Sequence, residues 1–167
     1  RLIAERTNLF LISMGAGAAG HAQYLFSDDV LGQNRGRVPR HAKVYADFAA
    51  GLARQGYTVM TFYYRGMGTS RPPAMRHSLR GFDADLFDWA DDVDAAIEHL
   101  AGTAPDAPLY LVGHSLGAQL PGMLKHRDRI AGLVSVAAGS GYWRDNAPPL
   151  KRMVLYFWHV LVPLATW

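Results

Sequence analysis

The stretch Leu109–Gln119, LYLVGHSLGAQ, decides the fold of this 167-residue chain. Its first four residues are apolar, which is typical of a short buried β-strand. The next five, Gly113 to Gly117, form a G-x-S-x-G pattern that predicts a sharp turn from a strand into a helix, with Ser115 on it. Small residues two positions before and after the serine let strand and helix pass closely. We therefore expect the Ser115 hydroxyl to be exposed above the edge of a sheet.

Strand and helix patterns alternate on both sides of this stretch. Besides the strand at 109–112, β-branched and aromatic runs or helical spacing of apolar residues predict elements over 8–13, 44–52, 57–63, 85–100, 114–124 and 130–137. Because the strands are apolar on both faces and helices separate them, we predict an α/β fold: a mostly parallel sheet with helices on both faces. The acids of 85–100 are interpreted as a solvated helix face, and Pro121 is expected to end or kink the helix after Ser115.

Composition narrows the chemistry that the chain can perform. Half of the residues are apolar and 19% are charged, which is typical of one globular domain. The chain has no cysteine, which excludes disulfides, cysteine-bound zinc and a thiol nucleophile. No pattern calls for a cofactor. Any covalent catalysis must therefore use another side chain.

Charge and hydropathy indicate which partners to expect. The net charge is only +3, and the one basic stretch also contains glycine and proline, so we interpret it as a solvated loop and expect no nucleic-acid partner. The apolar run Met153–Ala165 contains His159 and Pro163 and is shorter than the ~20 residues of a membrane span, so no stable membrane insertion is expected. No secretory signal is visible, which favours a cytoplasmic location.

The turn at Ser115 is suited to acyl chemistry. The backbone N–H of Leu116, at the start of the expected helix, can stabilise the oxyanion that forms when the hydroxyl attacks an acyl carbon. A second N–H donor is expected from Gly15 or Ala16, in the loop after the 8–13 strand. The residues alone thus predict a nucleophile with an oxyanion site beside it.

Three stretches carry a family resemblance: LISMGAG (11–17), TFYYRGMGTS (61–70) and LYLVGHSLGAQ (109–119). They resemble the α/β-hydrolase superfamily, and within it the serine aminopeptidase-like and monoglyceride-lipase-like hydrolases. The resemblance implies a serine hydrolase that cleaves an ester or amide of a small acyl substrate through an acyl-enzyme. It implies Ser115 as the nucleophile, Leu116 and Gly15 or Ala16 as oxyanion donors, and 65–70 as the pocket edge.

Two departures from this family pattern concern the first half of the chain. Tyr63 stands where relatives usually carry an acid, which we interpret as a structural position. A segment of about 20 residues, 18–37, separates the expected oxyanion loop from Val38-Pro39. We therefore predict a hydrolase core over 1–141 with an unusual insertion at about 18–37, followed by the start of a helical cap over 142–167.

The sequence pattern does not identify a clear acid and histidine to act with Ser115. In this fold an acid and then a histidine follow the nucleophile along the chain. Asp145 and His159 have that order, but His159 falls within YFWHVLVP, an apolar helical pattern, so this pair is the weaker alternative. His126 and Asp128 are expected in a turn on the wrong side of the sheet.

We therefore expect the acid and base to lie beyond Trp167, which makes the chain a C-terminally truncated member of the family with an incomplete fold. The isolated chain is then expected to be inactive, and its intact form to be a serine hydrolase. The alternative is a non-catalytic protein that uses the hydrolase fold to bind a small molecule or a partner.

Overall fold

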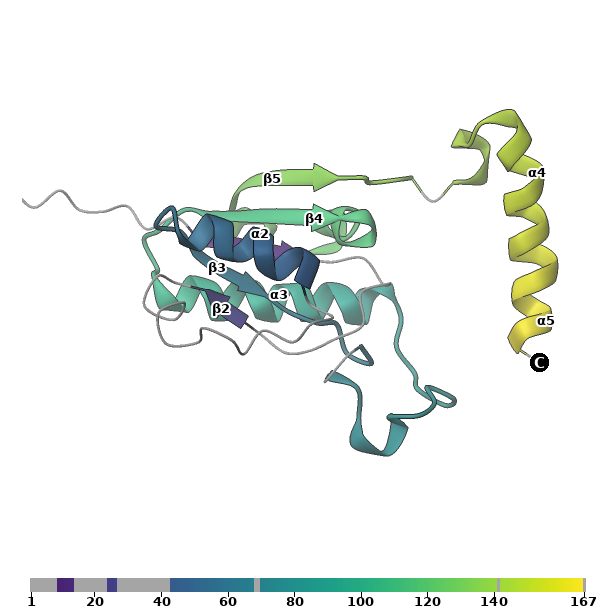
Figure 1. Cartoon of the computed structure of the whole chain (residues 1–167), viewed down its shortest axis with the longest axis horizontal. Coiled ribbons are helices and arrows are strands. Elements are labelled where there is room, and N and C mark those ends of the chain that lie inside the picture. The colour runs from purple at the N-terminus through teal and green to yellow at the C-terminus, as the bar shows by residue number, and fades with distance from the viewer. Residues whose placement is uncertain (1–8, 14–23, 27–42, 68–69, 141, 167) are drawn as a thin grey trace, which may run out of the picture.

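The computed structural model describes residues 9–13, 24–26, 43–67, 70–140 and 142–166, and five strands in it form one sheet (Figure 1). The sheet order is β2-β3-β1-β4-β5. β1, β3, β4 and β5 run parallel, and β2 alone is antiparallel to its neighbour β3. The mostly parallel sheet predicted from the sequence is thus confirmed. The strands span β1 Leu9–Ser13, β2 Tyr24–Phe26, β3 Thr58–Thr61, β4 Leu109–His114 and β5 Ile130–Val136.

The helices vary in length and kind. Two long α-helices pack on the sheet, α2 (Lys43–Ala53) and α3 (Leu86–Thr103). The C-terminal region is helical through α4 Pro148–Tyr156, the π-helix η8 Phe157–Leu161 and α5 Val162–Thr166. Short 3₁₀ helices complete the structure: η3 Pro73–Met75, η4 Ser115–Ala118, η5 Leu120–Met123, η6 Arg127–Arg129 and η7 Trp143–Asp145.

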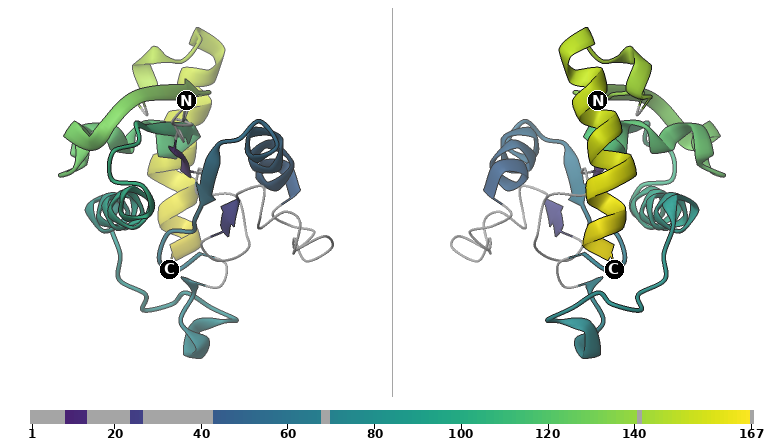
Figure 2. Two further views of the ribbon diagram at one scale, coloured as in Figure 1. Left: turned by 90° about the vertical axis from the view of Figure 1, so that its left-hand side faces the viewer. Right: turned by 90° about the vertical axis from the view of Figure 1, so that its right-hand side faces the viewer.

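The two long helices cover opposite faces of the sheet (Figure 2). Successive strand residues point to opposite faces, and the core accordingly divides into two clusters. Met60, Leu109 and Leu111 pack with the apolar side of α3. Val59 and Val112 pack with α2. Helices on both faces, as the sequence predicted, explain why these strands are apolar throughout.

One strand lies where no regular element was predicted. β2 falls inside segment 18–37 and pairs with β3 at the edge of the sheet, with Tyr24 opposite Thr61. Three residues are too few for a period-2 pattern to stand out, which is why no strand was predicted there. The segment therefore contributes to the sheet.

The start of α3 is fixed by its own acids. The Asp85 carboxylate accepts hydrogen bonds from the backbone N–H groups of Phe87 and Asp88, at 2.7 and 3.0 Å. The Asp88 carboxylate accepts in return from the Asp85 N–H at 2.9 Å. This capping box satisfies N–H groups that a helix start leaves unpaired.

Further along α3, acids anchor the loop that follows β3. The Arg65 guanidinium donates to Asp92 at 2.8 and 2.9 Å and to Asp88 at 2.7 Å, and the Arg65 backbone N–H also donates to Asp92 at 2.7 Å. The interpretation of this helix face as merely solvated was therefore wrong for these two acids. The network holds the loop against the helix near the carboxyl edge of the sheet.

The C-terminal helices form an arm that extends away from the sheet in Figure 1. Its helical character agrees with the sequence. Large apolar side chains along it are exposed, among them Tyr156, Phe157 and Trp158. Within the described residues, no helix has both the length and the apolar character needed to cross a bilayer.

The Arg65 network generates a stability prediction. Asp92→Asn is expected to lower the free energy of unfolding by about 1–2 kcal/mol, since charge-assisted hydrogen bonds are lost but are partly screened by solvent. Asp91→Asn is the matched control, because the neighbouring Asp91 pairs with Lys125 at an exposed position. Urea denaturation measures both, and equal losses in the two variants would contradict the role of Arg65–Asp92.

Candidate active site

The turn after β4 places Ser115 in an unusual backbone conformation. Ser115 has φ +54°, in the left-handed region, and it is exposed. Among the described non-glycine residues, only Ala137, just after β5, shares a positive φ. An L-residue pays about 1–2 kcal/mol for this conformation, so neighbouring structure must hold it. The turn therefore presents the serine hydroxyl at the carboxyl edge of the sheet.

Gly113 is the residue that makes this turn possible. A Cβ atom at Gly113 would lie 2.5 Å from the carbonyl oxygen of Gly117 and 2.6 Å from the Cα of Ala118. Real Cβ atoms do not approach backbone so closely, so only glycine fits. The chain after Ser115 thus folds back directly over the end of β4, as the spacing of the glycines predicted.

The helix predicted over 114–124 was wrong in kind. Two 3₁₀ helices, η4 and η5, occupy this region, and Pro121 lies in the first turn of η5. Proline supplies no N–H and blocks the carbonyl four residues earlier, which prevents a continuous α-helix. Leu116 therefore lies in the short 3₁₀ helix that begins at Ser115, and the support expected from the dipole of a long helix is absent there.

His114 is held by a residue of α2. The Tyr45 hydroxyl lies 2.7 Å from His114 Nδ1, and the two rings are 5.8 Å apart between centroids. Burial raises the pKa of the Tyr45 phenol, so the phenol keeps its proton at neutral pH. This contact commits one ring nitrogen of His114 to the packing between α2 and β4. The sequence carried no signal for it, because the two residues are 69 positions apart.

Of the expected oxyanion loop, the structure describes only the strand end that precedes it, at Ser13. β1 and β4 are paired so that Ser13 lies beside Gly113, and both strands end at the edge that carries Ser115. Gly15 and Ala16 follow β1 but lie outside the described residues. The register therefore brings the end of β1 next to the serine turn.

Asp145 lies in η7, after the loop that follows β5. Its carboxylate accepts a hydrogen bond from the Ser140 hydroxyl. The Gln119 side chain donates to the carbonyl of Gly139, which joins the segment after Ser115 to the same loop. An acid is thus present beyond β5, in a loop tied to the serine turn.

His159 lies in η8, on the arm that stands away from the sheet (Figure 1). Across the described ranges, no hydrogen bond or ion pair links Ser115, Asp145 and His159. The structure therefore does not assemble these three residues into a triad. His126 lies elsewhere, between Asp94 and Glu98 of α3.

The close approach at Gly113 generates a prediction. Gly113→Ala is expected to lower the free energy of unfolding by about 3 kcal/mol through overpacking, a fall of roughly 6–12 °C in the melting temperature. Gly122→Ala is the control, because a Cβ there meets no atom within 4 Å. Differential scanning calorimetry compares them, and an unchanged Gly113→Ala variant would refute the geometry of the turn.

Solved structures similar to this chain share its fold. A structure reported for LipS and LipT, two metagenome-derived lipolytic enzymes, has 24% identity and a TM-score of 0.53 over 88% of this chain. A thermostable carboxyl esterase from Bacillus coagulans has 15% identity and a TM-score of 0.54 over 91%. XC6422 from Xanthomonas campestris, an α/β serine hydrolase without a lid, has 22% identity and a TM-score of 0.51 over 86%.

This chain spans about half the length of those structures, covering 47%, 43% and 54% of them respectively. A comparison with curated proteins finds no match. The sequence profile Hydrolase_4, described as serine aminopeptidase S33, matches residues 37–166. With the parallel sheet described above, these matches show that the chain has the α/β-hydrolase fold and is a member of the serine aminopeptidase S33 family.

Proposed function

We propose that Ser115 is the nucleophile of a serine hydrolase that cleaves an ester or amide bond through an acyl-enzyme. The observation that carries this proposal is the left-handed backbone of Ser115, exposed directly after a parallel strand. A position that costs energy in the folded state and buries no side chain is typical of a functional residue. The strand–turn context is the one expected of a nucleophile elbow.

The proposed reaction has two halves. Ser115 Oγ bonds to the acyl carbon, its proton passes to a base, and the carbonyl oxygen becomes an oxyanion. Collapse of this intermediate breaks the ester or amide bond, and the departing alcohol or amine takes the proton. Water then attacks the acyl-serine, releasing a carboxylic acid and the free hydroxyl.

Backbone N–H groups are proposed to stabilise the oxyanion. Leu116, directly after the serine, supplies one donor, and Gly15 or Ala16 supplies the other. The pairing of Ser13 with Gly113 supports this assignment, since it brings the chain after β1 to the serine turn.

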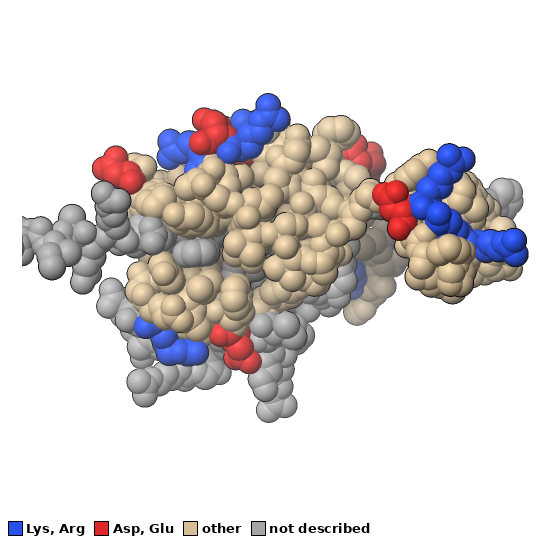
Figure 3. Space-filling view, turned by 90° about the horizontal axis from the view of Figure 1, so that it is seen from above, with Lys and Arg blue, Asp and Glu red and all other residues tan. Residues whose placement is uncertain are grey.

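The base and its acid are proposed to come from another part of the whole protein. Within the described residues, no histidine has a recorded bond to Ser115. β5 also supports a larger sheet, because Leu133, Val134 and Val136 on its two faces are each more than 40% exposed. From above, mainly uncharged side chains cover the face over β5 (Figure 3). A strand apolar on both faces is typical of a covered position in a sheet.

An acyl substrate with an apolar part is the class we propose. The similar structures of lipolytic enzymes and of a carboxyl esterase share the fold of this chain. In addition, the arm over 148–166 exposes aromatic and aliphatic side chains that suit a cap over an acyl group. The sequence predicted the start of a helical cap over 142–167, and we propose that the arm is part of this cap.

Labelling with a fluorophosphonate tests the nucleophile. The experiment uses the 167-residue chain and any longer polypeptide that its gene encodes, each beside its Ser115→Ala variant. We expect Ser115-dependent labelling of the longer polypeptide and little labelling of the 167-residue chain, because a serine without a base is a poor nucleophile. Mass spectrometry of the labelled peptide identifies the modified residue.

Two results would contradict parts of this account. A folded longer polypeptide that remains unlabelled at Ser115 would favour the non-catalytic binding protein. Strong Ser115-dependent labelling of the 167-residue chain would show that Asp145 and His159, or another pair within it, activate the serine.

A further inference from the structure

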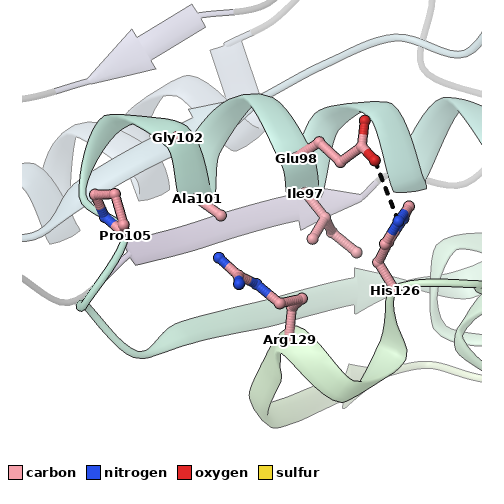
Figure 4. A pocket seen from close by; sticks show the side chains of 7 residues that line it. All are labelled: Ile97, Glu98, Ala101, Gly102, Pro105, His126 and Arg129. Atoms are coloured by element: carbon pink, nitrogen blue, oxygen red, sulfur yellow. Dashed lines mark ion pairs between the residues drawn. The ribbon is translucent and has the colours of Figure 1, made fainter.

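A cleft lies at the opposite edge of the sheet from Ser115. It has a volume of about 380 Å³ and lies between the C-terminal half of α3 and η6, which leads into the start of β5 (Figure 4). Parallel strands begin at one edge and end at the other, so this cleft is remote from the serine turn. It is lined by Ile97, Glu98, Ala101, Gly102, Pro105, His126 and Arg129.

The α3 wall of this cleft contains apolar residues. Ile97 is fully buried and Ala101 is 8% exposed, and both belong to the main core. A Cβ added at Gly102 meets no atom within 4 Å, and Gly102 is exposed, so the space beside the last turn of α3 is open to solvent. The accessible apolar part of the cleft therefore lies at Ala101 and the exposed Pro105, and the volume is in the size range of small-molecule sites.

The charged groups around this wall differ in their pairing. His126 Nε2 lies 3.1 Å from a Glu98 carboxylate oxygen, and the two form an ion pair only when the imidazole is protonated. The Arg129 guanidinium extends from η6 toward α3 across the cleft (Figure 4). It makes no recorded hydrogen bond or ion pair with the described part of the chain, in contrast to Arg65 and Lys125.

We propose that this cleft binds a small carboxylate with an apolar body. The carboxylate pairs with the Arg129 guanidinium, whose planar fork of N–H donors matches two carboxylate oxygens. The apolar body lies against Ala101 and Pro105. An uncharged apolar ligand would gain no ion pair with the guanidinium, and a cationic ligand would be repelled by it.

The structure offers one other role for Arg129. The last turn of α3 contains no basic residue, and its carbonyl groups carry partial negative charge. A cation nearby stabilises such a helix end without binding any ligand. Measurements of stability alone cannot separate these roles, so the test measures ligand binding.

Phenylacetate is the probe for this test, with phenylacetamide as its uncharged analogue. Titration followed by NMR shifts of the Gly102 and Arg129 amides is expected to give a Kd of about 1–10 mM for phenylacetate. Phenylacetamide is expected to bind roughly tenfold more weakly, because it loses the charge-assisted hydrogen bonds.

Three variants locate the binding. Arg129→Gln is expected to weaken phenylacetate binding about tenfold, while Arg127→Gln, on the same turn but not lining the cleft, leaves it unchanged. Gly102→Leu fills the open space without a clash at Cβ and is expected to abolish binding. Three results would overturn the proposal: equal binding of both probes, binding unaffected by Arg129→Gln, or no binding by the folded chain. If Arg129→Gln has no effect or the folded chain does not bind, Arg129 serves only as a cation at the end of α3.

Discussion

The close contact between Gly113 and the backbone of Gly117 and Ala118 is the constraint on which the site depends. It lets the chain reverse over the end of β4. Within this reversal, Ser115 has the left-handed backbone conformation. β4 is also the strand that pairs with both β1 and β5. A side chain at position 113 would therefore disturb the serine turn and the sheet together.

α3 connects this turn to the rest of the fold through its acids. Toward its N-terminus, Asp92 fixes the loop after β3 by binding Arg65. Two residues later, the 5% exposed Asp94 accepts hydrogen bonds from the backbone N–H groups of Lys125 and His126, each at 2.9 Å. A buried carboxylate is tolerated when such donors satisfy it. The helix thereby holds both the loop after β3 and the segment that follows η5.

The sequence predicted those features whose cause is local. The strand before Ser115, the glycines of the turn and the apolar stripe of α3 all follow from short-range pattern, and the structure has them. The 3₁₀ helices after Ser115 depend on the effect of Pro121, which the sequence indicated only as an interruption. The pairing of Arg65 with Asp92 and of Tyr45 with His114 joins residues 27 and 69 positions apart. No pattern in one sequence records such contacts, and for the same reason the partners of Ser115 could not be identified from spacing.

The proposed role of Ser115 depends on a fold that holds this residue at positive φ. The most direct measurement is the free energy of unfolding of Ser115→Gly against Ser115→Ala in the same chain. At an ordinary position glycine is less stable than alanine by about 0.5–1 kcal/mol, because its unfolded state is more flexible. At a left-handed position the order reverses, since alanine pays about 1–2 kcal/mol that glycine does not. Ser115→Gly is therefore expected to be the more stable variant, and a more stable Ser115→Ala would show that position 115 is not left-handed.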